Sequence, residues 1–231
     1  MPRYSRPRHH LHRILLAATG LALAATSALA FRPAVLAAVE ADAPAAATPE
    51  PSDAWLKGLT GSRRQLFDSP APGGGIPLVH ILNYYETLNK AYGVKDADID
   101  AVGTFYGSTT FHGVNDAMWS KYRIGEFLAA LDPSAKGPAP TANPWRASPQ
   151  ILGMALPQAS IESLQARGAT FILCNNALTI FSGMLAQARG LDANTVYADL
   201  KANILPGVHL VPGMVVAIEQ AQKAGVSYHR Q

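Results

Sequence analysis

Cysteine is nearly absent from this sequence: Cys174 is the single one among 231 residues, so no internal disulfide can form. Charge is scarce as well, with 15% charged residues against 48% hydrophobic ones. Such a balance lets a chain bury an apolar core instead of remaining disordered. The fold must therefore rest on packing alone, and its one thiol stays unpaired within the chain.

The basic residues do not form a continuous stripe along the chain. Four of the 19 basic residues lie in the first thirty positions, where there is no acidic residue: Arg3, Arg6, Arg8 and Arg13. Without these four, 15 basic residues face 16 acidic ones, which leaves residues 31–231 with a formal charge of about −1. No Lys/Arg stripe remains that would neutralise phosphates, so we expect no nucleic-acid partner.

Cofactor and metal motifs are missing too. The Gly73-Gly74-Gly75 run is not followed by the Lys-Ser/Thr of a phosphate-binding loop, and no dinucleotide fingerprint occurs. His80 and His209 are available, but no close His/Cys/Asp spacing of the zinc or copper type occurs in the sequence. We expect no cofactor and no metal.

The first thirty residues look like a secretory signal peptide. A basic stretch through Arg13 precedes the uncharged run 14–30, which ends in the small-residue exit Ala28-Leu29-Ala30. A second candidate cleavage site lies near Ala37-Ala38, and an uncleaved anchor of about 17 residues is the alternative. The leader predicts a periplasmic or secreted protein that leaves the membrane after cleavage.

The remaining chain divides into a linker and one domain. Residues 31–52 are rich in Ala and Pro and show neither a two-residue nor a 3.6-residue apolar period, which indicates a linker. In the domain, 53–231, strand-like and helix-like segments alternate. The predicted strands are 64–67, 99–106, 169–173, 208–211 and 226–228, with helices between them. This order predicts a single three-layer α/β domain with a mainly parallel five-stranded sheet.

Local signals place several elements. Pro77 suits the first turn of a helix over 77–92, and Gly93 suits its end. A second helix is predicted to follow the loop 107–113 and to run to residue 131. Its candidate core contacts are Val114, Met118, Phe127, Leu128 and Leu131.

A proline-rich segment, 132–157, interrupts the domain. Six prolines there exclude regular structure: Pro133, Pro138, Pro140, Pro144, Pro149 and Pro157. The segment is either a lid or an insertion without a role. Trp145 within it predicts that part of the loop packs.

Cys174 is the candidate catalytic residue. It ends the predicted buried strand 169–173 and opens the next helix, at the sheet edge where open α/β folds bind ligands. Backbone N–H groups and the positive end of a helix both stabilise an anion, and so a thiolate. The alternative is a small buried hydrophobic residue.

Three further residues are candidates for ligand binding at this edge. His112, in the loop after the second strand, would act as a proton partner or hold an anion, and a Cys–His pair requires hydrogen-bond contact. Asn175 and Asn176 would orient a bound sulfur group through their amides. The alternatives are a histidine that only caps its turn and an asparagine that only caps the helix.

The run Gly168-Ala-Thr-Phe-Ile-Leu-Cys174-Asn-Asn-Ala-Leu resembles the strand, cysteine and helix start of the DsrE/DsrF-like sulfur-relay family. Two later runs, Leu205-Pro-Gly-Val-His-Leu-Val-Pro-Gly213 and Gln222-Lys-Ala-Gly-Val-Ser-Tyr228, are similar to the family's closing strand, helix and strand. The similarity covers about residues 160–231, and 65–131 agrees in layout. The leader, the linker and the proline-rich segment lie outside it.

The resemblance implies a DsrE-like parallel fold and a cysteine that accepts sulfane sulfur and passes it to a partner protein. Cys174 matches that position. Characterised relays are cytoplasmic assemblies of several subunits, whereas this chain carries a predicted signal peptide. We therefore expect an exported, sulfurtransferase-like sulfur carrier, a homo-oligomer with a donor or acceptor protein as partner. A periplasmic small-anion binding module and a non-catalytic oligomer subunit remain the alternatives.

Overall fold

A computed structural model describes residues 53–132 and 137–231, all of which belong to one compact unit. Its sheet has five strands: β1 (Arg63–Asp68), β2 (Ile99–Phe105), β5 (Thr170–Cys174), β6 (Val208–Val211) and β7 (Ser227–Arg230). Their order is β6-β5-β2-β1-β7, and every neighbouring pair is parallel. The predicted parallel α/β sheet is thereby confirmed. The predicted signal peptide and linker lie outside the described residues.

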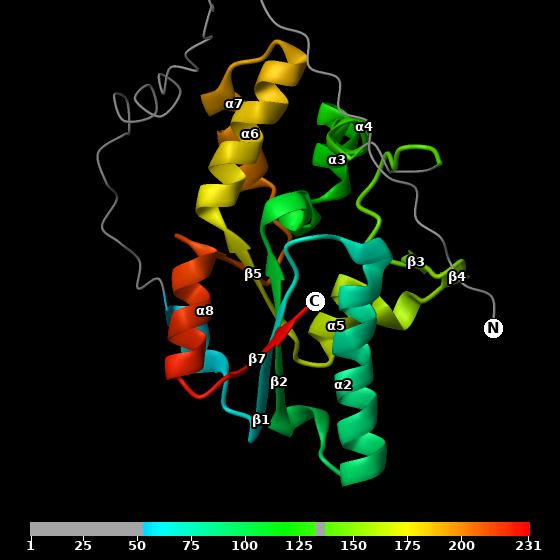
Figure 1. The fold of residues 1–231 in the computed structure, drawn as a ribbon, viewed down its shortest axis with the longest axis vertical. Coiled ribbons are helices and arrows are strands. Elements are labelled where there is room, and N and C mark those ends of the chain that lie inside the picture. The colour runs from blue at the N-terminus through cyan, green and yellow to red at the C-terminus, as the bar shows by residue number, and fades with distance from the viewer. Residues whose placement is uncertain (1–52, 133–136) are drawn as a thin grey trace, which may run out of the picture. The chain divides into compact units, whose positions relative to one another are not determined.

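Helices cover both faces of the sheet. In Figure 1, α8 (Met214–Lys223) stands on one side of the strands, and α2 (Ile76–Tyr92) and α5 (Ile161–Ala166) stand on the other. Beyond the carboxyl edge lie α3 (Asp116–Tyr122), α4 (Ile124–Leu131), α6 (Asn175–Arg189) and α7 (Ala193–Ala202). The single domain thus has three layers.

Short elements complete the domain. Five 3-10 segments are present in the described part: η1 (Ala54–Gly58), η2 (Gly73–Gly75), η3 (Asp96–Asp98), η4 (Gly107–Gly113) and η5 (Pro157–Ala159). Within the proline-rich segment, β3 (Gln150–Ile151) and β4 (Met154–Ala155) form a small antiparallel hairpin. The sequence predicted neither the hairpin nor η4, because two-residue strands and single 3-10 turns leave no periodic pattern.

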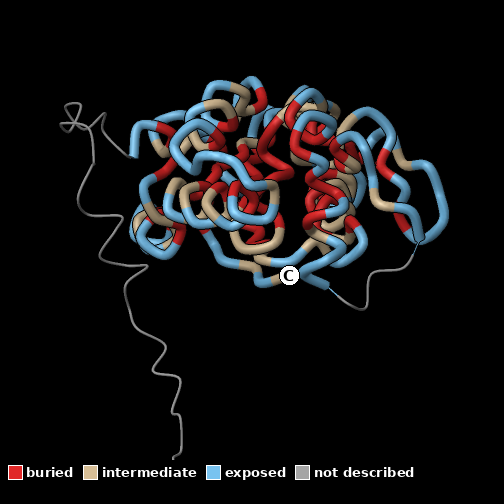
Figure 2. Tube along the Cα trace, turned by 90° about the horizontal axis from the view of Figure 1, so that it is seen from above, coloured by how far each residue is buried: buried red, intermediate tan, exposed pale blue. Residues whose placement is uncertain are grey.

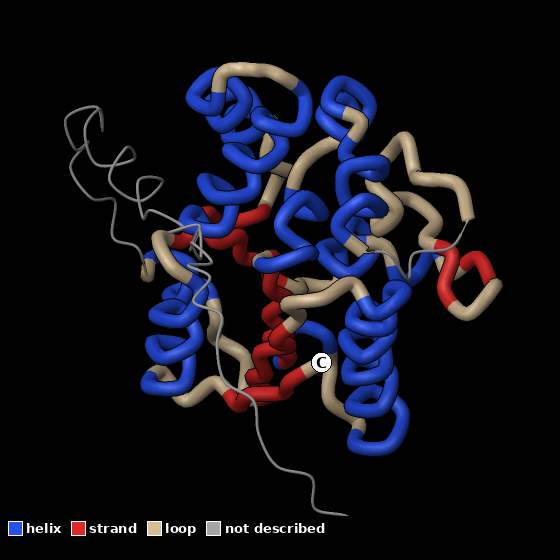
Figure 3. The backbone as a smooth tube through the Cα atoms, turned by 45° about the horizontal axis from the view of Figure 1, so that its top comes forward, coloured by secondary structure: helices blue, strands red, loops and turns tan. Residues whose placement is uncertain are grey.

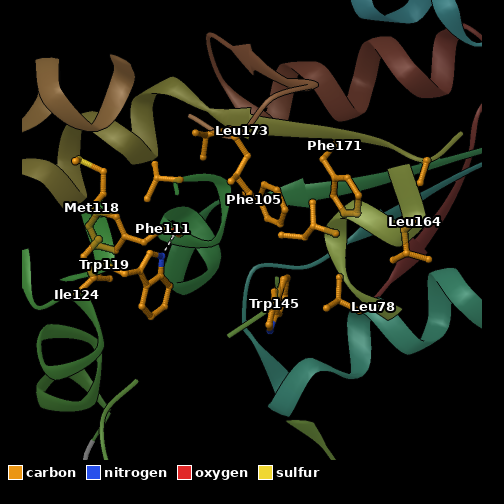
Figure 4. Packing of buried hydrophobic residues seen from close by; sticks show 14 of the residues in the cluster. Leu78, Phe105, Phe111, Met118, Trp119, Ile124, Trp145, Leu164, Phe171 and Leu173 are labelled. Atoms are coloured by element: carbon orange, nitrogen blue, oxygen red, sulfur yellow. Dashed lines mark hydrogen bonds between the residues drawn. The ribbon is translucent and has the colours of Figure 1, made fainter. Parts of the chain in front are cut away.

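The core is divided by the sheet into two clusters. Successive strand residues point to opposite faces, so Phe171 and Leu173 enter one cluster and Ile172 and Cys174 the other. The larger, here called the major core, packs under α2 to α7 and includes Phe105, Trp119 and Phe171 (Figure 4). The smaller, the minor core, consists of Trp55, Leu59, Leu66, Val102, Ile172, Cys174, Val211, Met214, Ala217, Ala221 and Val226. Figure 2 shows the buried residues inside the shell of exposed ones.

Helix boundaries follow local backbone geometry. Gly93 ends α2 at φ 66°, a left-handed conformation that glycine adopts without strain, as its position predicted. Arg123 takes a similar conformation, φ 52°, and divides the predicted helix through residue 131 into α3 and α4. The expected core contact of Leu131 is wrong, because this residue lies in the last turn of α4 and is 46% exposed.

The described part of the proline-rich segment packs against η4. Trp145 is buried, as expected, and the Asn143 Nδ2 donates to the carbonyl oxygens of His112 and Val114 at 2.8 and 2.9 Å. The segment therefore belongs to the major core and not to the side of the sheet that holds Cys174. Within the described ranges, no helix is both long and apolar enough to cross a bilayer.

Candidate functional site

The site lies at the carboxyl ends of the neighbouring strands β5 and β6. The helices that follow these two strands pack on opposite faces of the sheet. After β5 it enters α6, which packs Leu178 and Leu185 into the major core. After β6 it enters α8, which packs Met214 and Ala217 into the minor core. A crevice at such a divergence is where open α/β sheets place their ligands. Figure 1 and Figure 3 show α8 and α2 on opposite sides of the strands.

Cys174 occupies this divergence. Its Sγ accepts a hydrogen bond from the Ala177 N–H in the first turn of α6, at 3.4 Å. It accepts a second from the Met214 N–H, the first residue of α8, at 3.3 Å. Two helix N-termini therefore point their donors and their partial positive charge at one sulfur atom, which stabilises an anion there.

The thiol itself caps α6, so Cys174 is the N-cap residue and Asn175 already lies in the helix. The expectation that an asparagine caps this helix is corrected by that geometry. Sulfur fills the cap position because β5 runs straight into the helix with no turn between them. Only 5% of the cysteine surface is exposed.

Asn175 and Asn176 lie beside the thiol but turn to different partners. The Asn175 Oδ1 accepts from the Tyr197 hydroxyl of α7 at 2.7 Å. Asn176 is exposed, and its backbone N–H donates to the Pro212 carbonyl at 3.2 Å, which ties the start of α6 to the loop before α8. Asn176 is thus the more exposed of the two amides beside the thiol.

His112 does not reach Cys174. Its Nδ1 lies 3.3 Å from the Thr109 carbonyl oxygen, and its ring packs on Trp119 and Trp145 of the major core. The shared sheet edge was predicted correctly, but the sheet itself stands between the two side chains. A direct Cys–His pair is therefore absent from the described residues.

No protein-family model and no curated protein matches the sequence. Among solved structures, the chain is similar to a protein of unknown function from Methanobacterium thermoautotrophicum, with 18% sequence identity and a TM-score of 0.35. The similarity covers 74% of this chain and 100% of that one. The resemblance to DsrE/DsrF-like proteins stays an expectation from the sequence.

A polar group missed by sequence reasoning lies on the face of Cys174, at the same edge. Asp68, at the end of β1, is 4% exposed, and its Oδ2 accepts from the Tyr228 hydroxyl at 2.6 Å. Its Oδ1 is buried without a hydrogen-bond partner in the described part of the chain. Strand order places Tyr106 between Cys174 and Asp68, and Tyr106 packs against the minor core.

The two tyrosines stay protonated beside this carboxyl group. Burial, followed by a hydrogen bond to Asp68, raises the pKa of Tyr106. The hydrogen bond to Asp68, followed by burial, raises the pKa of Tyr228. Both phenols therefore act as donors, and Asp68 can accept one bond more. An aspartate at the end of a strand, at the same edge of the sheet as Cys174, is the sequence signal that would have indicated Asp68.

Residues 53–132 and 137–231 contain no group of three His, Cys, Asp or Glu side chains arranged to hold an ion. The site as described consists of the Cys174 sulfur atom, the two N–H donors aimed at it and the exposed Asn176 beside it.

Proposed function

We propose that the protein carries sulfane sulfur as a persulfide on Cys174. The observation that supports this most is the convergence of the Ala177 and Met214 N–H groups on Sγ, at 3.4 and 3.3 Å. A thiolate is the nucleophile in sulfur transfer, and donors at helix N-termini stabilise it. The resemblance to DsrE/DsrF-like proteins supports the same role for this cysteine.

The transfer needs no external oxidant. The Cys174 thiolate attacks the sulfane sulfur of a donor such as thiosulfate, and a new S–S bond forms on the protein. The donor's S–S bond breaks, and sulfite leaves with the electron pair. In the return step an acceptor thiolate attacks the outer sulfur, and the Cys174 thiolate leaves. The thiol proton is lost to solvent before the first step.

Burial selects the kind of donor. Because only 5% of Cys174 is exposed, a small anionic donor would reach its sulfur atom more easily than a bulky one. The same two helix N-termini that stabilise the thiolate also attract the charge of thiosulfate. A protein acceptor would dock over the start of α6, where Asn176 is exposed. Homo-oligomer formation and a periplasmic or secreted location complete the proposal.

Mass spectrometry of the intact protein tests the proposal. After incubation with thiosulfate, the wild type should gain one sulfur atom, about 32 Da, that dithiothreitol removes, whereas Cys174→Ser should gain none. An Ile180→Ala variant, which keeps the thiol and changes an exposed side chain of α6, should still gain it.

Two other results would point elsewhere. Saturable binding of thiosulfate without a mass increase, in wild type and Cys174→Ser alike, would favour the small-anion binding module. Neither adduct nor binding, with an intact assembly, would favour a non-catalytic oligomer subunit.

A further inference from the structure

The described part of the chain forms an open cavity of about 710 Å³ on the other side of the sheet from Cys174. The loop at the start of α2, with Gly73, Gly74 and Gly75, forms one wall. His112 of η4 and Trp145 and Ile151 of the proline-rich segment form others. This volume lies within the range of sites for small molecules, about 300–1,000 Å³.

Two largely buried side chains, His112 and Trp145, line this cavity and carry polar ring nitrogens. His112 is 3% exposed and Trp145 is 4% exposed, and their ring centroids lie 4.2 Å apart. Since the His112 Nδ1 faces the Thr109 carbonyl, Nδ1 carries the proton and Nε2 keeps a lone pair. Neither that nitrogen nor the Trp145 indole N–H has a hydrogen-bond partner among the described residues.

Trp119 shows the contrast. It lines the same cavity, but its Nε1–H donates to the Phe111 carbonyl oxygen at 2.8 Å, the dashed line in Figure 4. Buried tryptophan N–H groups usually find such a partner. The His112 Nε2 and the Trp145 Nε1–H are not among the fully buried unpaired atoms of the described residues, so a molecule in the cavity that both residues line can hydrogen-bond to them.

The chemistry of the pair selects the ligand. His112 offers an acceptor, because burial lowers its pKa to about 3 and keeps the ring neutral, and Trp145 offers a donor beside it. A hydroxyl group matches both, since it donates one hydrogen bond and accepts another. The surrounding walls are flat and apolar, built from Trp119, Ile151 and the ring of Pro144. Aromatic rings pack well against such faces.

We propose that this cavity binds a small aromatic alcohol, of which phenol is the simplest, with its hydroxyl group bridging the His112 Nε2 and the Trp145 Nε1–H. The binding is separate from the sulfur chemistry proposed for Cys174, because the cavity is lined by the major core. A Cys174→Ser variant should bind phenol as the wild type does.

Titration by NMR tests the proposal on the ¹⁵N-labelled full chain. The chain has three tryptophans, so three indole N–H signals are expected. Phenol should shift the signal of Trp145 saturably, whereas Trp55, in the minor core, should not respond. Toluene has a similar shape without the hydroxyl and should bind at least about tenfold more weakly, the equivalent of one good hydrogen bond.

Two substitutions test the hydrogen bonds to phenol separately from the shape of the cavity. Trp145→Phe keeps an aromatic ring without the N–H, and His112→Phe keeps a flat ring without Nε2. Each should weaken phenol binding toward that of toluene and leave toluene binding unchanged, and Trp55→Phe should alter neither. If His112→Phe does not fold, Trp145→Phe alone still decides.

Equal affinities for phenol and toluene in the wild type would overturn the proposal in favour of an apolar void. So would a folded protein that binds neither compound at millimolar concentration, since water would then be the occupant of the cavity.

Discussion

The two faces of the sheet differ in what covers them. On one face, α2 to α7 bury a continuous set of large aromatic and aliphatic side chains. On the other, α8 and η1 cover a smaller group that includes Ala217 and Ala221 of α8 and Val211 of β6. Cys174, Asp68 and Tyr106 all lie at the carboxyl edge of this thinner side.

Under the proposed function, the major core would serve stability and the thinner side would carry the sulfur chemistry. Large buried rings contribute most to stability when they pack on several neighbours, as Phe171 does against Phe105 at a centroid distance of 5.2 Å. A reactive thiol needs solvent or a partner within reach, which a thin cover provides more easily. We expect substitutions on the two sides to act accordingly.

The largest effect is expected for Phe171→Ala, on the major-core face of β5. Its side chain is 1% exposed and stacks on Phe105, so truncation leaves a cavity that the neighbours cannot fill. The free energy of unfolding should fall by about 3–5 kcal/mol, as measured by urea denaturation. A loss below about 1 kcal/mol would remove the distinction between the two faces.

The next effect depends on pH and belongs to His112. Burial lowers its pKa to about 3, while the unfolded chain takes up the proton near pH 6.5. Between these values the unfolded state binds the extra proton, so stability falls as the pH decreases, by at most about 1.4 kcal/mol per unit. From pH 6.5 to pH 5 the loss should approach about 2 kcal/mol.

His112→Gln provides the matched control, because the amide keeps a donor for the Thr109 carbonyl but does not titrate in this range. Its free energy of unfolding should change less than that of the wild type between pH 7 and pH 5. Parallel curves for the two proteins would show that His112 is protonated in the folded state.

A smaller effect is expected for Cys174→Ser on the thin side. The serine hydroxyl is a good helix N-cap and can accept from the Ala177 and Met214 N–H groups in place of sulfur. Thermal and urea unfolding should show a loss below about 2 kcal/mol. A loss as large as that of Phe171→Ala would make Cys174 a packing residue.

The smallest effect is expected at the N-cap of α5, a helix that packs on the major core. The Ser160 Oγ accepts from the Ser163 N–H at 3.1 Å and caps α5. Ser160→Ala should cost about 1 kcal/mol, because the first turn loses one acceptor. Ser160→Asn, which restores a capping oxygen, should recover part of the loss in the same urea measurement.

Much of the element order could be predicted from the sequence, because periodicity and glycine stops are local signals. The fully buried strand β2, the end of α2 at Gly93 and the succession of β5 and α6 are examples. The break at Arg123 was not predictable in this way, since a non-glycine residue at positive φ is set by tertiary contacts.

The sequence predicted where the site lies in the fold, but not which side chains surround Cys174. The sequence placed Cys174 and His112 at one edge, yet their side chains enter opposite faces of the sheet. Which face a loop residue reaches depends on how η4 folds back on α3, where the Trp119 indole meets the Phe111 carbonyl. The approach of α8 to Cys174 depends likewise on strand order, which no local pattern records.

The strand order also has a consequence for the time course of folding. Tyr228 meets Asp68 across a separation of 160 residues, whereas Ser69 meets Thr104 across 35. Contacts between distant segments cost more loop-closure entropy and tend to slow folding. We expect β1, β2 and β5 to assemble first with the helices between them, and β7 to dock late. The thin side of the domain would then close last, and the thiol would reach its final surroundings only when nearly all of the chain has already folded.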